Sequence, residues 1–421
     1  MSIRTSGWSA IRRCAVAAAL LPACAPRARE APLPERGRGE TVLLVSIDGF
    51  RWDYLDRGLT PNLSRLAGEG VRAEALIPVF PTKTYPNHYT IVTGRYPAKH
   101  GIIGNVLTAP DIGRRLSLWD RDAVRDPRFY LAEPIWVTAE GQGRRTAPLF
   151  WPGNEAPING VLPTYAVPYD GKMPDTAKIA WMLERLQLPA DRRPVFLTLY
   201  FPLVDNAGHE YGPDAPETDS AIAAADGLIG RTMLGLERIG RRDVNVVVVS
   251  DHGMAATGPD RVIWLDQYLA KDALKVDEMS TLLTAWPAPG LEDSVQRALA
   301  RAPHLTVYSR AELAARWRLD GVRVPPVVAV ADEGWTISRR TPEEPAPEII
   351  LGNHGYDDTL TSMGATFIAR GPAFRRGVRV PAFRNIHIYP LLTWVLGITP
   401  VETDGTLDSV RAILSPSGDV Q

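Results

Sequence analysis

Cysteine is nearly absent from this chain. Only Cys14 and Cys24 occur among its 421 residues, and both precede residue 25. The remaining chain therefore has no disulfide of its own, even in an oxidising compartment.

An excess of charge of either sign is also missing. Lys and Arg number 47 against 48 Asp and Glu, the formal net charge is -1, and no block of basic residues stands out. A protein that binds nucleic acid by releasing counterions needs such a block, so we expect no stable nucleic-acid complex. A small anionic ligand needs only a local positive site and is not excluded.

A short apolar run lies near the N-terminus, behind three arginines. Residues 14–25 are too few to cross a bilayer but suit the core of a signal peptide, so residues 1–25 predict export to the periplasm. The sequence LPAC, ending at Cys24, resembles a bacterial lipobox and predicts membrane anchoring through a lipid on Cys24; cleavage after Ala25 is the alternative. Residues 26–39, rich in Pro, Arg and Glu, predict a tether.

Three apolar runs in the body predict buried parallel strands, at residues 41–50, 194–205 and 244–254. Amphipathic helical patterns separate them. Strands that alternate with helices predict an α/β fold with a doubly wound, mostly parallel central sheet, helices on both faces, and ligands beyond the carboxyl ends of the strands. We expect one catalytic domain over residues 40–415, with a small subdomain inserted within about 255–348, where Pro, Ala and Arg are frequent.

Each of the three runs carries an aspartate near its end: Asp48, Asp205 and Asp251. Three carboxylates on one rim repel one another unless cations lie between them. His209 follows Asp205 by four residues, His252 adjoins Asp251, and His354 lies in a Gly-flanked loop. Carboxylates combined with imidazoles favour zinc and its transition-metal neighbours over magnesium or calcium. Taken alone, each aspartate is more often a helix cap or turn former, but the joint pattern predicts a two-metal site.

The segment PTKTYPNHYT, residues 81–90, suggests a nucleophile for such a site. Two metals about 3.5 to 4 Å apart stabilise in-line displacement at phosphorus. A threonine at the start of a helix would place its hydroxyl near the positive helix end, where phosphate binds well. Thr82, Thr84 and Thr90 all qualify by this chemistry, and N-capping is the alternative role of each.

Several long motifs in order resemble a known family. They are the run from Ser46 to Asn105, followed by VDNAGHEYGP, VVSDHGM and GNHGYDD. The chain from about Thr41 to residue 398 resembles the nucleotide pyrophosphatase/phosphodiesterase (type I phosphodiesterase) family of the alkaline phosphatase superfamily, in its compact bacterial form. The resemblance implies an alkaline-phosphatase-like fold.

The resemblance also implies roles for individual residues. Thr84 would be the nucleophile, and Asn105 would donate a hydrogen bond to a phosphate oxygen. Two Zn²⁺ per chain are implied, and their ligands divide into two sets: one of Asp205, His209 and His354, the other of Asp48, Asp251, His252 and the Thr84 oxygen.

The activity implied by the resemblance is hydrolysis of nucleotide phosphodiester and pyrophosphate bonds through a phosphothreonine intermediate. Substrates would be dinucleotides, nucleoside triphosphates and nucleotide sugars, and products nucleoside 5′-monophosphates. Tyr85 and Tyr169 match aromatic positions that sandwich the base; simple packing is the alternative for both.

Three other functions are weighed against this one. A phosphomonoesterase of the same superfamily needs further Lys or Arg donors, which the sequence does not reveal. A choline-phospholipid or phosphonate hydrolase would keep the metals and change the pocket. A non-catalytic zinc-binding exported protein would have no use for Thr84 and Asn105. Sulfatase chemistry is disfavoured because it uses a modified Cys or Ser in its own motif.

Overall fold

The computed structural model describes residues 40–340 and 350–416. The predicted signal peptide, the lipobox at Cys24 and the tether lie outside this range, as does the last part of the predicted insertion. Within the described residues, no helix has the length and apolar character needed to span a bilayer.

A seven-stranded sheet forms the centre of the molecule, and it is mixed. β17 runs antiparallel to both of its neighbours, β8 and β2, whereas the other neighbouring strands pair in parallel. The predicted α/β fold with a mostly parallel sheet is therefore confirmed. The strand order is β18 (Val378–Val380), β2 (Val71–Ala73), β17 (Phe367–Arg370), β8 (Asn245–Val249), β1 (Val42–Ile47), β7 (Phe196–Phe201) and β6 (Thr146–Pro148).

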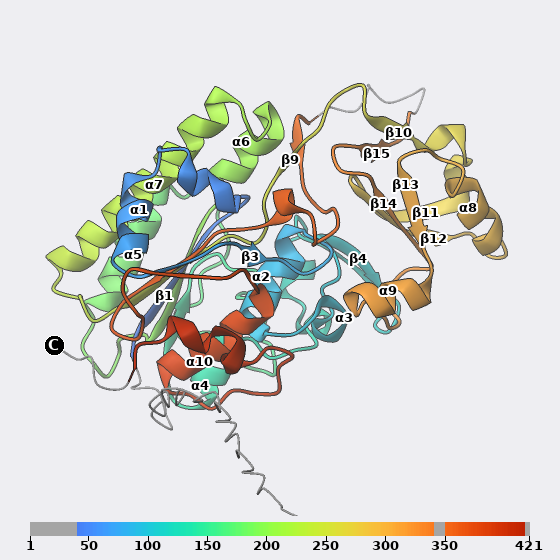
Figure 1. The fold of residues 1–421 in the computed structure, drawn as a ribbon. Helices are drawn as coiled ribbons and strands as arrows, with labels where there is room; N and C mark the ends of the chain where they lie inside the picture. The colour runs from blue at the N-terminus through green and yellow to red at the C-terminus, as the bar shows by residue number, and fades with distance from the viewer. Residues whose placement is uncertain (1–39, 341–349, 417–421) are drawn as a thin grey trace, which may run out of the picture.

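Helices cover both faces of this sheet (Figure 1). Because side chains alternate along a strand, Val42 and Leu44 of β1 pack into one core and Leu43 and Val45 into the other. The first core includes α2 (Thr84–Thr93), α4 (Ile135–Gly141) and α10 (Ile388–Leu396). The second includes α1 (Pro61–Gly68), α5 (Asp175–Leu186) and α7 (Pro216–Arg238).

One predicted strand ends earlier than the sequence pattern indicated. β7 stops at Phe201, and α6 (Leu203–Tyr211) begins two residues later, so Asp205 lies in a helix and not at the end of a strand. Pro202 accounts for the break, since it has no N–H to donate to the sheet.

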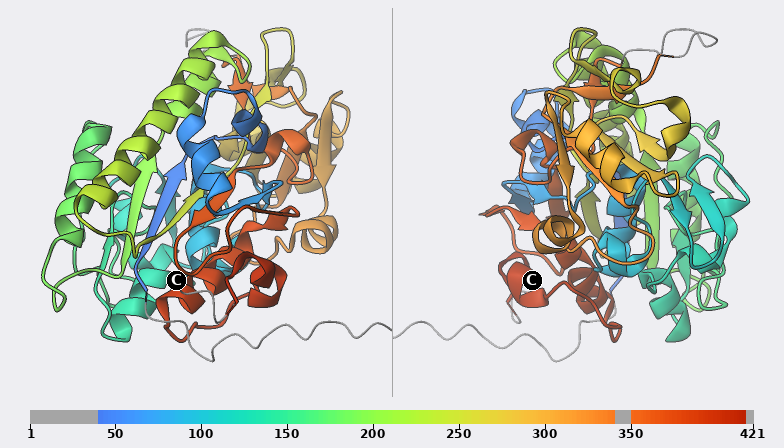
Figure 2. Two further views of the ribbon diagram at one scale, coloured as in Figure 1. Left: turned by 60° about the vertical axis from the view of Figure 1, so that its left-hand side comes forward. Right: turned by 90° about the vertical axis from the view of Figure 1, so that its right-hand side faces the viewer.

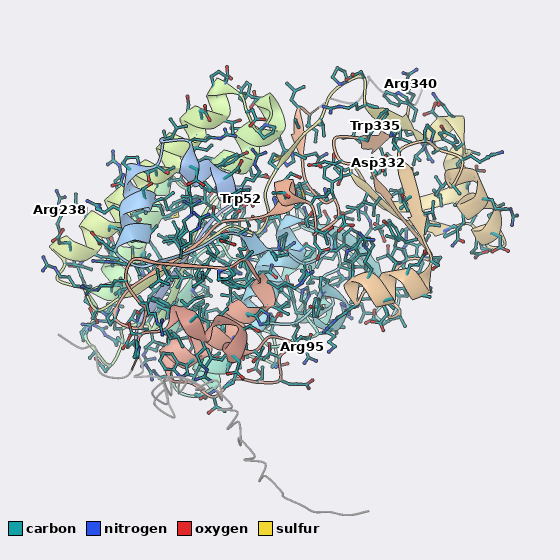
Figure 3. The ribbon with its side chains drawn as sticks, in the orientation of Figure 1. Trp52, Arg95, Arg238, Asp332, Trp335 and Arg340 are labelled. Carbon is teal, nitrogen blue, oxygen red and sulfur yellow. The ribbon has the colours of Figure 1, made fainter. Side chains whose placement is uncertain are left out.

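A second, four-stranded antiparallel sheet lies beside the first, at the upper right of Figure 1 and toward the viewer in the right panel of Figure 2. The chain leaves the main body through β9 (Ala255–Ala256) and returns through β16 (Gly352–Asn353), which pairs with β9. Figure 3 shows Asp332, Trp335 and Arg340 gathered on this part of the molecule, while Arg238 lies on the opposite side. We call the segment between β9 and β16 the inserted segment.

The remaining elements are short. The inserted segment contains β11 (Leu274–Met279), β12 (Leu282–Pro287), β13 (Leu305–Tyr308), β14 (Val327–Ala331), α8 (Glu292–Leu299), α9 (Arg310–Trp317) and the parallel pair β10 (Val262–Trp264) and β15 (Thr336–Ser338). The main body adds α3 (Pro97–His100), the hairpin β4 (Val106–Ala109) and β5 (Arg114–Ser117), and the pair β3 (Leu76–Ile77) and β19 (Phe383–Arg384).

Candidate active site

The carboxyl ends of β1 and β8 meet the start of α6 at one edge of the main sheet. Asp48 follows β1 directly, Asp251 follows β8 by two residues, and both are buried. Gly49 adopts a left-handed φ of 66°, and a Cβ built on it would lie 2.9 Å from the Cα of Asp205. Only glycine permits this approach, so the local backbone brings Asp205 beside Asp48.

Asp48, Asp251 and His252 form one compact group whose potential ligand atoms all lie within 4.8 Å of one another. The Nε2 atom of His252 is 3.0 Å from Asp251 Oδ2 and 3.6 Å from Asp48 Oδ1. The Thr84 hydroxyl oxygen lies 3.4 Å from the same Nε2. We call Asp48, Asp251 and His252 the inner group.

Asp205, His209 and His354 form a neighbouring outer group. His209 Nε2 lies 3.4 Å from Asp205 Oδ2, and His354 Nε2 lies 3.7 Å from Asp205 Oδ1. His252 joins the two groups, because its ring stacks on that of His354 at 3.5 Å and its ligand atom also lies within 4.8 Å of those of Asp205 and His354.

The three histidines are oriented alike. Each Nδ1–H donates to a backbone carbonyl: His252 to Gly253 at 3.0 Å, His354 to Thr82 at 2.8 Å, and His209 to Gly352 at 2.8 Å. This leaves every Nε2 lone pair directed at the carboxylates, which is the arrangement of metal-binding histidines.

Three buried carboxylate oxygens in the two groups have no hydrogen-bond donor among the described residues: Asp48 Oδ1, Asp205 Oδ1 and Asp251 Oδ2. Burial, together with the nearby Asp251 and Asp205, raises the pKa of Asp48 well above its usual value. Burying unpaired carboxylates so close together is unfavourable unless cations neutralise them. Oxygen atoms without donors beside free imidazole nitrogens suit zinc-type divalent cations.

Of the three threonines considered from the sequence, only Thr84 lines a cavity at this edge of the sheet. Thr82 is buried and donates to the Tyr356 carbonyl, and Thr90 is buried and bonded to His100 Nε2 at 2.9 Å. Thr84 is the first residue of α2 and lines a cavity of about 550 Å³. Its hydroxyl thus lies at the positive end of the helix.

Asn105 lines the same cavity from the loop before β4. Its side-chain oxygen accepts a hydrogen bond from the backbone N–H of Tyr85 at 2.8 Å. Because that oxygen is engaged, the amide N–H groups of Asn105 are left to donate to a ligand in the cavity.

Tyr85 and Tyr169 both line the cavity but differ in exposure. Tyr85 is 1% exposed, and its hydroxyl bonds to that of Tyr130. Tyr169 is 41% exposed and packs edge-on against Phe150, with ring centroids 5.2 Å apart.

Other residues at the site carry no signal that sequence reasoning detects. Arg121 lies 5.3 Å from the Tyr169 ring centroid and pairs with Glu155, and both line the cavity. Tyr200 donates to Asp48 Oδ2 at 2.6 Å. Arg121 lies in a segment without periodicity, and Tyr200 lies within a predicted strand whose apolar pattern says nothing of a contact with Asp48, so only the fold reveals either role.

Comparisons with known proteins show what this chain is similar to. The pattern of the type I phosphodiesterase / nucleotide pyrophosphatase family matches residues 42–357. Human ectonucleotide pyrophosphatase/phosphodiesterase family member 5 is 36% identical over 381 residues, which are 89% of this chain and 78% of the human protein. Mouse bis(5′-adenosyl)-triphosphatase is 35% identical over 379 residues, with coverage of 89% and 81%.

A solved structure is similar over the same extent. Mouse ectonucleotide pyrophosphatase/phosphodiesterase 5 superposes with a TM-score of 0.85 at 37% identity, covering 89% of this chain and all of the mouse chain. A second structure of the mouse protein, with the same TM-score, is of an inactive threonine-to-alanine variant in complex with AMP.

Proposed function

The chain belongs to the type I phosphodiesterase/nucleotide pyrophosphatase family, and from this premise we propose that it hydrolyses nucleotide diesters and pyrophosphates to nucleoside 5′-monophosphates. Family membership makes it an enzyme of the nucleotide pyrophosphatase/phosphodiesterase class. The observation that carries the proposal is the Thr84 hydroxyl, which lies at a helix start beside the inner group and lines the cavity. Dinucleotides, nucleoside triphosphates and nucleotide sugars are the proposed substrates.

Two Zn²⁺ per chain are part of the proposal. The inner group with the Thr84 oxygen would hold one, and the outer group would hold the other. When bound, these metals would neutralise charge on phosphate oxygens and favour the ionised form of an oxygen nucleophile. Support comes from the three unpaired carboxylate oxygens and from the three Nε2 atoms, which keep a lone pair because the Nδ1 atoms hold the protons.

Thr84 and Asn105 have different roles in the proposed reaction. The Thr84 oxygen attacks phosphorus and loses its proton, while the bond from phosphorus to the leaving oxygen breaks and that oxygen gains a proton. Asn105 donates to a phosphate oxygen as charge builds there. Water then breaks the bond between Thr84 and phosphorus, which releases the monophosphate and restores the hydroxyl.

The base of the nucleotide would stack against Tyr169, with Tyr85 forming the opposing wall. The ring of Tyr169 is 41% exposed, and stacking on an aromatic ring accepts every base. The mouse triphosphatase and the AMP complex of the mouse relative are consistent with a nucleotide in this cavity.

Export through residues 1–25, with lipid anchoring at Cys24, is also proposed. It rests on the sequence pattern, and the names of the ectonucleotide relatives agree with an enzyme that acts outside the cytoplasm. Metabolic labelling with a radioactive fatty acid, compared between the full chain and its Cys24→Ser variant, tests the anchor.

To test the catalytic proposal, diadenosine triphosphate is incubated with the zinc-loaded protein and the products are separated by chromatography. We expect AMP and ADP as products. Thr84→Ala should abolish turnover, whereas Thr93→Ala, at the other end of α2, should retain it. Release of inorganic phosphate from AMP in place of diester cleavage would contradict the proposal.

A further inference from the structure

One acidic side chain of the inserted segment reaches the loop that carries Asn105. Glu278 of β11 is 8% exposed and accepts a hydrogen bond from the backbone N–H of Val106 at 2.9 Å. Val106 directly follows Asn105, so this bond fixes the backbone beside the amide that faces the cavity.

An irregularity in β11 makes this contact possible. The pairing of β11 with β12 shifts register between Val276 and Glu278. Successive side chains normally point to opposite faces of a strand, but a bulge breaks the alternation. As a result the consecutive residues Asp277 and Glu278 both contact the β4–β5 hairpin, Asp277 through the N–H of Thr108 at 2.9 Å and its hydroxyl at 2.7 Å.

Asn105 is thereby held on several sides. Its side-chain oxygen is bound by the N–H of Tyr85, its carbonyl accepts from the N–H of Leu118 at 2.9 Å, and Glu278 binds the next peptide. The packing is close, because a Cβ placed on Gly104 would lie 3.1 Å from Glu278 Oε1. Glu278 therefore packs directly against the loop that carries Asn105.

The stability of the fold alone does not account for a buried carboxyl group at Glu278. Burial raises the pKa of its carboxyl group, and the charge of Lys83 with the N–H groups of Val106 and Asn105 offsets part of that effect. Its second oxygen, Oε2, is buried and has no hydrogen-bond partner among the described residues. Departures of this kind from full polar pairing are typical of functional sites.

We propose that Glu278 is a positioning residue, through which the inserted segment holds Asn105 where its amide can stabilise the phosphate in the transition state. This inference rests on the proposed function. It adds that the inserted segment contributes to catalysis without touching the substrate.

Glu278→Ala, Glu278→Gln, Asn105→Ala and the double variant Asn105→Ala/Glu278→Ala test it in the zinc-loaded protein. We expect Glu278→Ala to lower kcat about tenfold to a hundredfold and to weaken ground-state binding less, because a misplaced donor costs more in the transition state than in the bound substrate or product. Glu278→Gln keeps an acceptor oxygen for Val106 and should recover part of the loss. In the Asn105→Ala background, Glu278→Ala should have no further effect.

Asp277→Ala is the matched control, because Asp277 is the neighbouring buried carboxylate of β11 and binds the same β4–β5 hairpin. Hydrogen exchange should speed up at Val106 in Glu278→Ala and at Thr108 in Asp277→Ala, and only the former should lose kcat. An unchanged kcat in Glu278→Ala with fast exchange at Val106, or losses that multiply in the double variant, would overturn the proposal. If Glu278→Ala fails to fold, Glu278→Gln takes its place in the cycle.

AMP affinity, measured by calorimetry on the same variants, separates this inference from the proposed function. If the wild type binds AMP but does not cleave diesters, the proposed function fails. The positioning role then still predicts that Glu278→Ala and Asn105→Ala weaken AMP binding non-additively. Equal AMP affinity in the wild type and Glu278→Ala, or no binding to the wild type, overturns the inference.

Discussion

The Nε2 atom of His252 lies 3.4 Å from the hydroxyl oxygen of Thr84. This relationship joins the loop after β8 to the first residue of α2, two elements separated by more than 150 positions in the chain. It places the Thr84 hydroxyl, which lines the cavity, against the inner group of Asp48, Asp251 and His252. The proposed nucleophile and the proposed metal ligands therefore lie in contact, and substitutions of either can be compared in the same assays.

Thr84→Ser should retain measurable diesterase activity, because serine keeps a hydroxyl at the helix start. Thr84→Ala should lower kcat by at least about 10³-fold while leaving zinc content and AMP binding nearly intact. Steady-state kinetics with elemental analysis of the same samples make the comparison. Equal activity in the serine and alanine variants would remove Thr84 from the mechanism.

Asp205→Ala should lower bound zinc from two ions toward one per chain. Asp205 is the only carboxylate of the outer group, and its Oδ1 has no other partner among the described residues. Elemental analysis after dialysis measures the ratio. Asp260→Ala, in the inserted segment, is the control and should keep two ions; an unchanged ratio in Asp205→Ala would show that the outer group is not a metal site.

Tyr169→Ala should raise KM for a nucleotide diester about fivefold or more, because base stacking is worth roughly 1 to 3 kcal/mol. Tyr169→Phe retains the aromatic face and serves as the control, with KM near that of the wild type. Tyr169→Ala should scarcely affect KM for a diester without a base, such as bis(4-nitrophenyl) phosphate. A similar KM change for both substrates would argue that Tyr169 only shapes the loop.

His100 should make the stability of the fold depend on pH. Burial lowers its pKa to about 3, whereas the unfolded chain binds a proton at this histidine below about pH 6.5. The unfolded state therefore holds more protons between these values, so the free energy of unfolding falls as pH drops from about 6.5 toward 3. For one proton the slope approaches about 1.4 kcal/mol per pH unit.

His100→Gln removes this proton and keeps a donor for Thr90, so its stability should fall less steeply with acid. Urea unfolding at pH 7.5, 6 and 5 measures both slopes. Parallel slopes for the two proteins would rule out His100 as a source of acid sensitivity.

Much of the site could be predicted because its chemistry lies next to strong local patterns. Asp48 directly follows the apolar run that forms β1, Asp251 follows β8 by two residues, and the paired strands bring them to one edge. The α/β fold and the family could be predicted for the same reason.

The rest depends on tertiary structure that no local pattern encodes. Asp205 reaches the site from a helix and not from a strand, because Pro202 ends the sheet pairing. Glu278 contacts the Asn105 loop only through a bulge in β11. Arg121 and Glu155 meet across the cavity from two loops. None of these contacts leaves a periodic or spaced signal in the sequence.

The most direct test of the account compares kcat/KM of the zinc-loaded protein for three aryl substrates: an ester of a nucleoside 5′-monophosphate, an ester of phosphocholine, and a simple phosphate monoester. We expect a large preference for the nucleotide diester. Preference for the monoester would rule out the proposed diesterase activity, because the two metal groups would then serve a phosphatase with further cationic donors.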